Sequence, residues 1–436
     1  MKLPYILLPG AASISLVSAV SLPLHRREIP NPAPIQQVQN GVTFYADVEV
    51  NGQTFQLVPD TGSSDLWVPV ENFTCVNHTT ALVVPQENCA FSQTYKVPDS
   101  MEYVANQTFG VQYGTGIALG KVGYANVSIN GIGLSHAKVG LVDRTDEHGA
   151  GYGSGILGLG FPPVTSAHPG TELDNQTLLY NRAVYDPVFV QMYKQDLVEP
   201  WYSFAIERPP KDSSRGPGGW LGLGELPPVS HSDDWAVKPI EITESLPDEL
   251  TDGKREITLM TLTVDGVSWG NGSSRTTNST KFQAVVDTGN HMNLVPQPIA
   301  ESINNAFDPP GVFDQKEEVY IVDCNSTTPE LGITLDGHTF WHKTPDDLIF
   351  HDVRGFCFSS VAPTGSKGGL GLNFLGDAFL RNVVSVYDFE KTEMRFAART
   401  EDGDSSPPPT FTGAATALGI SAWYFTVFAL TVTLLR

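Results

Sequence analysis

The tripeptide Asp-Thr-Gly occurs twice in this chain, and each copy directly follows an apolar run. The first copy begins at Asp60, after residues 55–58, and the second begins at Asp287, after residues 282–286. One copy is weak evidence, because tight turns select the same residue types. Two copies at the ends of predicted strands indicate two similar lobes that each bring one carboxylate to a shared site. Paired carboxylates can divide general-acid and general-base work between them.

Length and composition predict a mostly β protein. The chain has 436 residues, which is too many for one ordinary core, so two lobes with processed ends are expected. It holds 41 Gly and 32 Pro, and short β-branched or aromatic runs alternate with turn residues. The formal net charge of −22 argues against nucleic acid as a partner. That acidity fits a soluble extracellular surface, or a protein that works at low pH, where carboxylates protonate and repulsion fades.

Four cysteines permit three disulfide connectivities, and the spacing alone does not choose between them. They fall into two local pairs, Cys75 with Cys89 and Cys324 with Cys357. Pairing within each lobe is the simplest arrangement if the lobes fold separately. Neither pair has the close spacing of a zinc site, and the ten histidines form no ligand motif. We therefore expect neither a metal nor any other cofactor.

The amino-terminal end predicts secretion and processing. Residues 1–19 carry an early lysine, an apolar stretch and a small-residue cleavage pattern, which is typical of a signal peptide. Residues 20–27 then form a short pro-segment that ends in His25-Arg26-Arg27. This dibasic pair predicts a processing site and a mature chain from about Glu28. A plain charged linker is the alternative.

Strand and turn patterns divide the rest of the chain into two lobes, residues 35–232 and 233–400. Residues 42–50 alternate in polarity, Asn51-Gly52 is a hairpin turn signal, and the returning strand carries Asp60 at its tip. The boundary is placed in a stretch rich in Pro, Ser and Asp near residues 227–234. Helical spacing is expected in residues 177–196 and 299–307.

The carboxyl-terminal end predicts a lipid anchor. Residues 401–413 are a Ser/Pro-rich stalk, and residues 414–436 end in an apolar tail with one final arginine. A membrane-spanning helix is the rival, but this tail is short and lacks a basic cytoplasmic stop. A removable GPI signal fits better, with Gly413 as the predicted attachment residue and Ser405 and Ala414 as alternatives.

Sequons for N-glycosylation are numerous. One Asn-x-Ser/Thr is often accidental, whereas eight behind a signal peptide predict a heavily glycosylated surface protein. They lie at Asn72, Asn77, Asn106, Asn126, Asn175, Asn271, Asn278 and Asn325.

These features together resemble the pepsin-like aspartic proteases, over roughly residues 40–398. The resemblance implies a bilobal pepsin-like acid protease fold, with two six-stranded-type β lobes and a cleft between them. It implies that Asp60 and Asp287 are the catalytic pair of an aspartic endopeptidase that hydrolyses peptide bonds at acidic pH through an activated water. Two carboxylates so close share one proton and titrate as a coupled pair. Polypeptides would be the substrates, and we expect a monomer.

The resemblance also implies roles for residues around the pair. Tyr113, in Tyr-Gly-Thr-Gly, resembles the tyrosine of a flap hairpin that closes over substrate, and Trp67 would hold its hydroxyl. Ser63 would donate to Asp60. The remaining site residues implied by the family are the loop-fixing threonines Thr61 and Thr288 and the flap or substrate-facing residues Gly62, Gly114, Thr115, Gly289 and Asn290. Cys324 and Cys357 have the spacing of the second-lobe disulfide of the family.

Three features depart from the family pattern, one of which is the loop between Cys75 and Cys89, longer than in pepsin and accompanied by sequons at Asn72 and Asn77. Asn290 stands where Ser or Thr is usual; its amide N–H is expected to donate to Asp287, which predicts altered pH dependence. The short pro-segment leaves control of activation open. A pepsin fold that binds or inhibits without catalysis is the alternative function.

The signal peptide, dibasic site and GPI tail resemble the yapsin-like cell-surface proteases of fungi, anchored at the outer face of the plasma membrane or the cell wall. Those enzymes tend to cleave after basic residues. The loop between the first two cysteines holds one acidic residue, Glu87, so this loop does not support a preference for basic residues. The overall negative charge leaves such a preference open.

Overall fold

The computed structural model describes residues 32–400, apart from 40, 78–79, 114–115, 147–150, 174–177, 209–214, 343–344, 352–354 and 366–370. The expected signal peptide, pro-segment, stalk and GPI signal lie outside the described residues. So do the predicted flap residues Gly114 and Thr115 and the sequon at Asn175.

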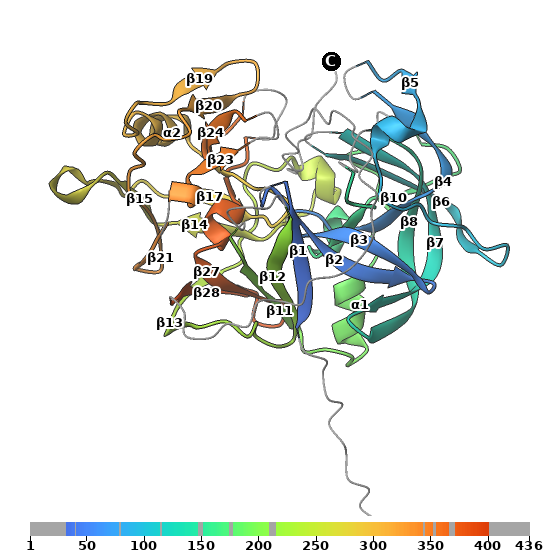
Figure 1. Cartoon of the computed structure of the whole chain (residues 1–436). Helices are drawn as coiled ribbons and strands as arrows, with labels where there is room; N and C mark the ends of the chain where they lie inside the picture. The colour runs from blue at the N-terminus through green and yellow to red at the C-terminus, as the bar shows by residue number, and fades with distance from the viewer. Residues whose placement is uncertain are drawn as a thin grey trace, which may run out of the picture.

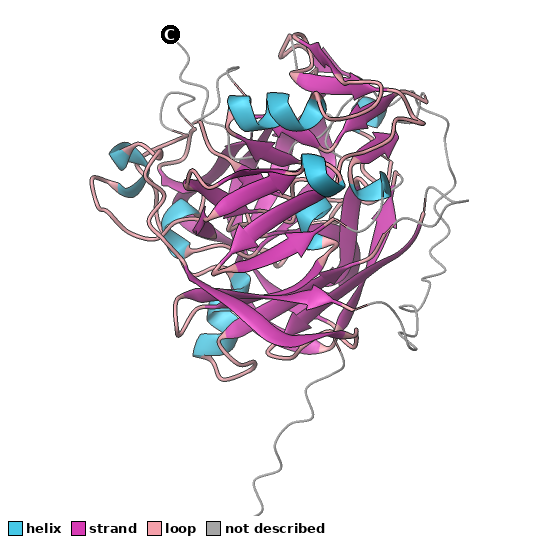
Figure 2. Ribbon diagram, turned by 90° about the vertical axis from the view of Figure 1, so that its left-hand side faces the viewer, coloured by secondary structure: helices cyan, strands magenta, loops and turns pink. Residues whose placement is uncertain are grey.

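Strands dominate the described chain (Figure 2) and form two lobes side by side (Figure 1). The prediction of a mostly β, two-lobed fold is confirmed. Three short α-helices occur among the described residues: α1 (Val188–Lys194), α2 (Gln297–Asn304) and α3 (Asp377–Leu380).

The first lobe is built on a large sheet that packs against more than one cluster of buried apolar residues. The hairpin of β2 and β3 turns at Asn51 and Gly52, whose φ angles of 46° and 76° lie in the left-handed region that Asn and Gly tolerate. The long hairpin of β6 and β7 lies beside it and carries Tyr113 at its tip. The strands of this lobe are β2 (Thr43–Val50), β3 (Gln53–Asp60), β4 (Leu66–Val76), β5 (Val83–Val84), β6 (Glu102–Tyr113), β7 (Gly116–Ile129), β8 (Ile132–Thr145), β9 (Ile156–Gly158) and β10 (Ala167–Pro169).

A six-strand stretch of the same sheet joins the two lobes, in the order β1, β12, β11, β27, β28, β13. Its members are β1 (Ala33–Val38), β11 (Trp201–Ile206), β12 (Gly216–Leu223), β13 (His231–Pro239), β27 (Val383–Asp388) and β28 (Glu393–Arg399). Strands from both sides of the expected boundary therefore pair with one another: β11 pairs with β27, and Ser203 lies opposite Val386.

The second lobe holds three smaller sheets. The central one leads to the second Asp-Thr-Gly and has the order β14 (Thr261–Val264), β17 (Phe282–Val286), β26 (Phe374–Leu375), β18 (Asn293–Val295) and β25 (Val361–Pro363). The next contains β16 (Thr276–Asn278), β15 (Gly266–Trp269), β21 (Leu331–Leu335) and β22 (His338–Trp341). The third contains β19 (Val312–Asp314), β20 (Val319–Val322), β24 (Cys357–Ser359) and β23 (Ile349–His351).

The helix expected over residues 177–196 is wrong over most of its length. Only α1 forms, and it begins directly after Pro187, whose ring suits a helix start but not a helix interior. The described residues before it instead direct Arg182 and Tyr185 inward, where Arg182 makes a partly buried hydrogen bond and Tyr185 a buried one. The second predicted helix, at residues 299–307, corresponds to α2.

Two disulfides join Cys75 to Cys89 and Cys324 to Cys357, so the pairing is within each lobe. His351 Nδ1 lies 3.2 Å from Cys357 Sγ, but a sulfur in a disulfide offers no thiolate to a metal. Among the described residues, no helix combines the length and the apolar character that crossing a membrane requires.

Candidate active site

The two Asp-Thr-Gly loops meet face to face at the junction of the lobes. β3 ends at Asp60, and β17 ends one residue before Asp287. A Cβ on Gly62 would lie 2.7 Å from the carboxylate carbon of Asp287, and one on Gly289 would lie 2.6 Å from Asp60 Oδ1. Each glycine therefore lies against the aspartate of the other lobe, and no larger residue fits at either position. Both aspartates are buried.

The threonines of the two loops form reciprocal hydrogen bonds across the lobe interface. Thr61 N–H donates to Thr288 Oγ1 at 3.1 Å, and Thr288 N–H donates to Thr61 Oγ1 at 3.0 Å. Each hydroxyl also donates to a carbonyl of the opposite lobe, Thr61 to Val286 and Thr288 to Pro59. This reciprocal set fixes the spacing of the two carboxylates.

Apolar strands behind each loop support it from the rear. β9 runs parallel to β3, with Asp60 opposite Gly158, and β26 runs parallel to β17, with Val286 opposite Leu375. Leu159 N–H donates to Asp60 O at 2.8 Å. The same arrangement therefore occurs in both lobes, with an apolar strand running parallel to the strand that carries each loop.

The donors around the two carboxylates are unequal. Gly62 N–H donates to Asp60 Oδ1 at 2.8 Å, and Ser63 Oγ donates to Asp60 Oδ2 at 2.5 Å. On the other side, Gly289 N–H donates to Asp287 Oδ1 at 2.8 Å, but Asp287 Oδ2 receives no hydrogen bond from a donor in the described residues.

The expectation that the Asn290 amide donates to Asp287 is wrong for this structure. Asn290 Oδ1 accepts a hydrogen bond from Met292 N–H at 3.0 Å, which turns the side chain into its own loop. The Nδ2 group of this buried side chain has no hydrogen-bond partner within the described part of the chain. The short polar side chain satisfies a nearby backbone donor instead of the carboxylate.

Burial raises the pKa values of both aspartates, but the other groups around them act differently on the two. Burial raises the pKa of Asp60, while the hydrogen bonds from Ser63, Asp287 and Gly62 lower it again. Burial raises the pKa of Asp287 well above its usual range, and the nearby charges of Asp60 and Asp377 raise it further. The proton that the pair shares is therefore held more strongly at Asp287.

The β6–β7 hairpin places Tyr113 beside the first loop. Tyr113 lies opposite Gly116 at the end of the hairpin, and its ring is buried. Trp67 Nε1–H donates to the Tyr113 hydroxyl at 2.8 Å. That hydroxyl also lies within hydrogen-bonding reach of Ser63, the residue that donates to Asp60.

Comparison with known proteins identifies the family. Residues 43–399 match the model of the eukaryotic aspartyl proteases. The chain belongs to the eukaryotic aspartyl protease family. It is 34% identical over 365 residues to a probable aspartic-type endopeptidase of Aspergillus fumigatus, covering 82% of this chain and 79% of the relative. It is 27% identical to rhizopuspepsin-3 of Rhizopus niveus over 372 residues, covering 84% of this chain and 81% of that protein.

A solved structure agrees on the fold. The crystal structure of an aspartic proteinase from Irpex lacteus matches with a TM-score of 0.63 at 19% identity, covering 85% of this chain and 98% of that one. Relatives named as endopeptidases and pepsins make this protease a pepsin-like aspartic endopeptidase, whose substrates are polypeptides. They favour the enzymatic interpretation over a non-catalytic binding protein.

Behind the pair of this protease lies a further buried carboxylate, that of Asp377. Asp377 opens α3, and its N–H donates to Asn290 O at 2.8 Å. Burial raises the pKa of Asp377 well above its usual range, although the buried Arg381 guanidinium lowers it in part. The Leu-Gly-Asp sequence that precedes α3 marks this position, but its burial beside the pair is visible only in the fold.

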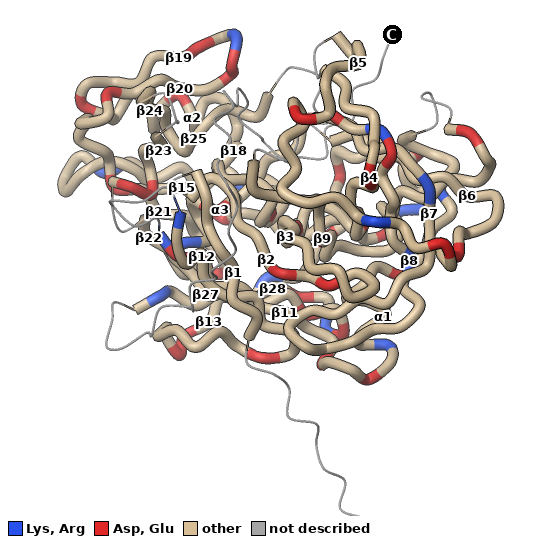
Figure 3. Tube along the Cα trace, turned by 45° about the vertical axis from the view of Figure 1, so that its right-hand side comes forward, with Lys and Arg blue, Asp and Glu red and all other residues tan. Residues whose placement is uncertain are grey.

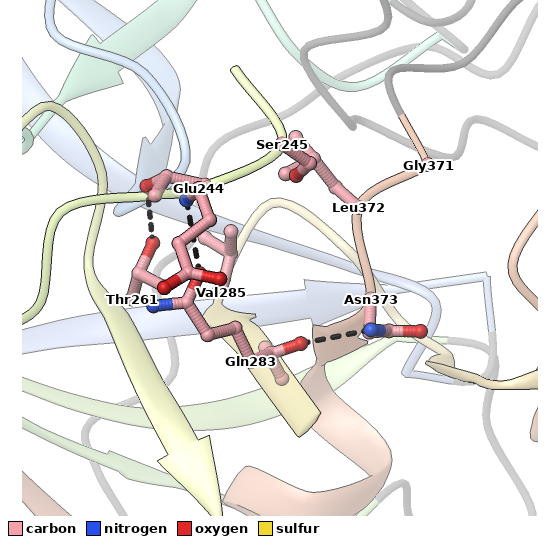
Figure 4. A pocket seen from close by; sticks show the side chains of 10 residues that line it. Glu244, Ser245, Thr261, Gln283, Val285, Gly371, Leu372 and Asn373 are labelled. Carbon is pink, nitrogen blue, oxygen red and sulfur yellow. Dashed lines mark hydrogen bonds between the residues drawn. The ribbon is translucent and has the colours of Figure 1, made fainter. Parts of the chain in front are cut away.

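A cavity of about 180 Å³ borders the strand that leads to Asp287 (Figure 4). Its walls combine amide, hydroxyl and carboxylate groups with a few apolar side chains. The Asn373 amide donates to Gln283 O at 2.8 Å, and Gln283 Oε1 accepts from Glu244 N–H at 3.0 Å. The residues that line this cavity come from four separate segments, so no local sequence pattern predicts the cavity. The lining residues are Thr243, Glu244, Ser245, Thr261, Gln283, Ala284, Val285, Gly371, Leu372 and Asn373.

Proposed function

We propose that Asp60 and Asp287 are the catalytic pair, with Asp60 ionised and Asp287 holding the shared proton. The observation that carries the assignment is the unequal set of donors: Ser63 and Gly62 stabilise the charge on Asp60, whereas Asp287 Oδ2 receives no donor from the described residues. Hydrogen bonds to a carboxylate favour its charged form, and burial favours the neutral form.

The proposed reaction is hydrolysis by an activated water. Asp60 takes a proton from the water as its oxygen bonds to the peptide carbonyl carbon, and Asp287 gives its proton to the carbonyl oxygen. The tetrahedral intermediate then collapses. The C–N bond breaks, the proton held by Asp60 passes to the leaving amine, and Asp287 regains a proton from the new carboxyl group.

The β6–β7 hairpin is proposed to be the flap that covers the substrate, with Tyr113 as its fixed aromatic group. Trp67 would hold that group. Gly114 and Thr115, which lie outside the described residues, stay predicted flap residues. Gly62 and Gly289 would face the substrate backbone, because these small residues lie on the loops of the pair. Asn290 lies on the second loop, but its buried side chain is turned toward Met292 N–H. A flap that excludes water strengthens the electrostatic interactions inside the site.

Activity at acidic pH is proposed from the pair and from the surface charge. A pair that shares one proton loses its general acid once both carboxylates ionise. The chain carries 48 acidic residues against 26 Lys and Arg, and Figure 3 shows the acidic positions on both lobes. Partial protonation in acid would reduce their mutual repulsion.

The catalytic assignment is tested with a quenched-fluorescence peptide library between about pH 3 and pH 7. Wild type should cleave after removal of residues 1–27, whereas Asp60→Asn and Asp287→Asn should each lose at least about 10³-fold in kcat. A statine-type inhibitor should bind the wild type. Cleavage by either variant at the wild-type rate would rule out the pair, and an inactive wild type that still bound peptides would favour a non-catalytic binding function.

We also propose that the protease is secreted and processed. Residues 1–19 would be removed as a signal peptide and residues 20–27 as a pro-segment, with cleavage after Arg27. The position of β1 supports this limit: Ala33–Val38 lies beyond Arg27 and pairs with both β2 and β12 in the sheet that joins the lobes, so cleavage after Arg27 leaves the pairing of β1 intact. The sequon asparagines Asn72, Asn106, Asn126, Asn271 and Asn325 are exposed and so accessible to glycosylation.

A GPI anchor on the outer face of the plasma membrane or cell wall completes the proposal. The lobes, residues 35–232 and 233–400, would be followed by the stalk at 401–413, with attachment at Gly413, or at Ser405 or Ala414, and loss of residues 414–436. This arrangement favours the yapsin-like type, acting as a monomer.

The test is release of the full-length chain from intact cells by a phosphatidylinositol-specific phospholipase C. A variant lacking residues 414–436 should appear directly in the medium. Retention of the wild type after phospholipase treatment, or of the truncated variant at the membrane, would contradict the anchor. Size-exclusion chromatography with light scattering would check the monomer, and the peptide library would reveal any preference for basic residues.

A further inference from the structure

A short strand outside the β6–β7 hairpin braces it from the side. β10 pairs antiparallel with β6, with Ala167 opposite Phe109 and His168 opposite Thr108 (Figure 1). We call residues 164–169 and 182–185 the brace. Ala183 N–H donates to Ala167 O at 2.7 Å, which joins the two stretches. The brace therefore extends the sheet of the proposed flap at its outer edge.

The brace holds both backbone groups of one flap residue. Gly110 N–H donates to Ser166 O at 3.0 Å, and Gly110 O lies 2.9 Å from His168 Nε2. Because a carbonyl can only accept, the His168 ring donates through Nε2–H. His168 is buried, and Gly110 precedes Tyr113 by three residues on the same strand. The position of Gly110 therefore determines where the strand delivers Tyr113.

The other end of the brace is attached to the first catalytic loop. Asp65 lies five residues after Asp60 and is buried. Its Oδ1 accepts a hydrogen bond from the Tyr185 hydroxyl at 2.5 Å and one from Ser166 N–H at 2.9 Å. Arg182 fastens the turn by donating to the carbonyls of Val164 and Thr165, each at 3.0 Å.

These contacts form a closed circuit, in which two separate paths link Asp65 to Tyr113. From Asp65, one path runs through β4 to Trp67, which donates to the Tyr113 hydroxyl. The second path runs through Ser166 to Gly110 and along β6 to the same tyrosine. Attachment at two points, Gly110 and Tyr113, fixes both the position and the orientation of β6. Attachment at one point would let the strand rotate about it.

We propose that Tyr185 and His168 are positioning residues of this protease: through Asp65 and Gly110 they hold the flap strand in the place where Tyr113 covers the substrate. The inference rests on the proposed function of the β6–β7 hairpin. Both side chains act on substrate binding without touching the reacting atoms. The expected consequence of their loss is a KM effect, because a displaced flap weakens ground state and transition state alike.

The first test replaces the anchoring hydroxyl. Tyr185→Phe keeps the ring in its apolar cluster and removes only the donor to Asp65. It should raise KM for an extended peptide about 5- to 10-fold, the effect of losing one buried hydrogen bond, and leave kcat within about 2-fold. Hydrogen–deuterium exchange of residues 107–113 should become faster.

A matched control separates positioning from general stability. Tyr95 is buried, and its hydroxyl accepts a hydrogen bond from Asn51 Nδ2 at 2.8 Å, outside the circuit. Tyr95→Phe should lower Tm by about as much as Tyr185→Phe does, since each removes one buried hydroxyl. It should leave KM and the exchange of residues 107–113 at their wild-type values.

The second test uses rescue at His168. His168→Ala removes the donor to Gly110 O, whereas His168→Gln can place an amide N–H at a similar reach. The alanine variant should show raised KM and fast exchange at residues 107–113, and the glutamine variant should recover at least half of both. Unchanged KM and exchange in Tyr185→Phe and His168→Ala would overturn the proposal. Exchange is measured without catalysis, so an inactive wild type would instead count against the proposed function.

Discussion

The Ser63 hydroxyl donates a 2.5 Å hydrogen bond to Asp60 Oδ2, and this contact makes the two carboxylates of the cleft unequal. The equivalent position of the second loop, Asn290, supplies no such donor to Asp287, because its carbonyl oxygen accepts from Met292 N–H. The difference between one serine and one asparagine therefore underlies the proposal that Asp60 carries the negative charge.

Ser63→Ala should shift the acidic limb of the pH profile toward higher pH. The hydrogen bond from Ser63 lowers the pKa of Asp60, against the effect of burial, so its loss raises that pKa. Hydrogen bonds to charged groups contribute about 1.5–3 kcal/mol, which corresponds to a shift of about one to two pH units. The measurement is kcat/KM against pH. Ser64→Ala, which removes a donor to Phe161 O, is the control. An acidic limb at the same pH in wild type and in Ser63→Ala would contradict the assignment.

Asp287→Asn should stabilise the fold at neutral pH while abolishing activity. The pKa of Asp287 is raised by burial, so its stabilising contribution is complete below the usual value of 3.8 and is lost as pH rises through the raised value. A neutral amide avoids that loss. Thermal unfolding at pH 7 should show a higher Tm, by about 2–4 °C for each kcal/mol gained, and the gain should vanish in acid. Exposed Asp99→Asn should show neither effect.

Trp67 and Tyr113 should behave as one unit in a double-mutant cycle. The indole N–H donates to the phenol at 2.8 Å, so Trp67→Phe and Tyr113→Phe remove the same hydrogen bond. Each single variant should raise KM about tenfold, and the double variant should be scarcely worse than either. Additive losses in KM would show that the hydrogen bond does not couple them. Trp269→Phe, buried in the second lobe, controls for the loss of an indole.

The ion pair of Arg208 with Asp347 should stabilise the contact between the lobes in a pH-dependent way. Arg208 Nε and Nη2 each donate to the buried Asp347 carboxylate at 2.9 Å. Burial would raise the pKa of Asp347, but Arg208 outweighs it and holds that pKa below its usual range. The stability is therefore present above the unfolded pKa and is lost as pH falls through the folded value.

Arg208→Leu should cost about 3–5 kcal/mol in the free energy of unfolding near neutral pH, because it leaves a buried charge unpaired. The loss should shrink in acid as Asp347 protonates. Lys194→Met, which breaks the exposed pair with Asp186, should cost under about 1 kcal/mol in the same denaturant titration. A loss at Arg208 that was independent of pH would contradict the electrostatic explanation.

Local patterns predicted the parts of the fold that neighbouring residues control. Asn51-Gly52 forms the predicted hairpin turn, because its positive φ angles are a property of those two residues. The helix over residues 177–196 failed for the opposite reason. Tyr185 makes its decisive contact with Asp65, 120 residues away in the chain, and no local spacing reveals that hydrogen bond.

The sequence by itself determined the family, the two lobes and the two aspartates, because a repeated motif at strand ends leaves few other folds. Only the tertiary structure decided which donors reach each aspartate and what Asn290 contacts. It also decided how the brace reaches Gly110. Each of these three features depends on burial or on the direction of a hydrogen bond, and these properties arise only when distant segments pack together. The pKa of a carboxylate, for example, reflects the groups that surround it in space and not its neighbours in the chain.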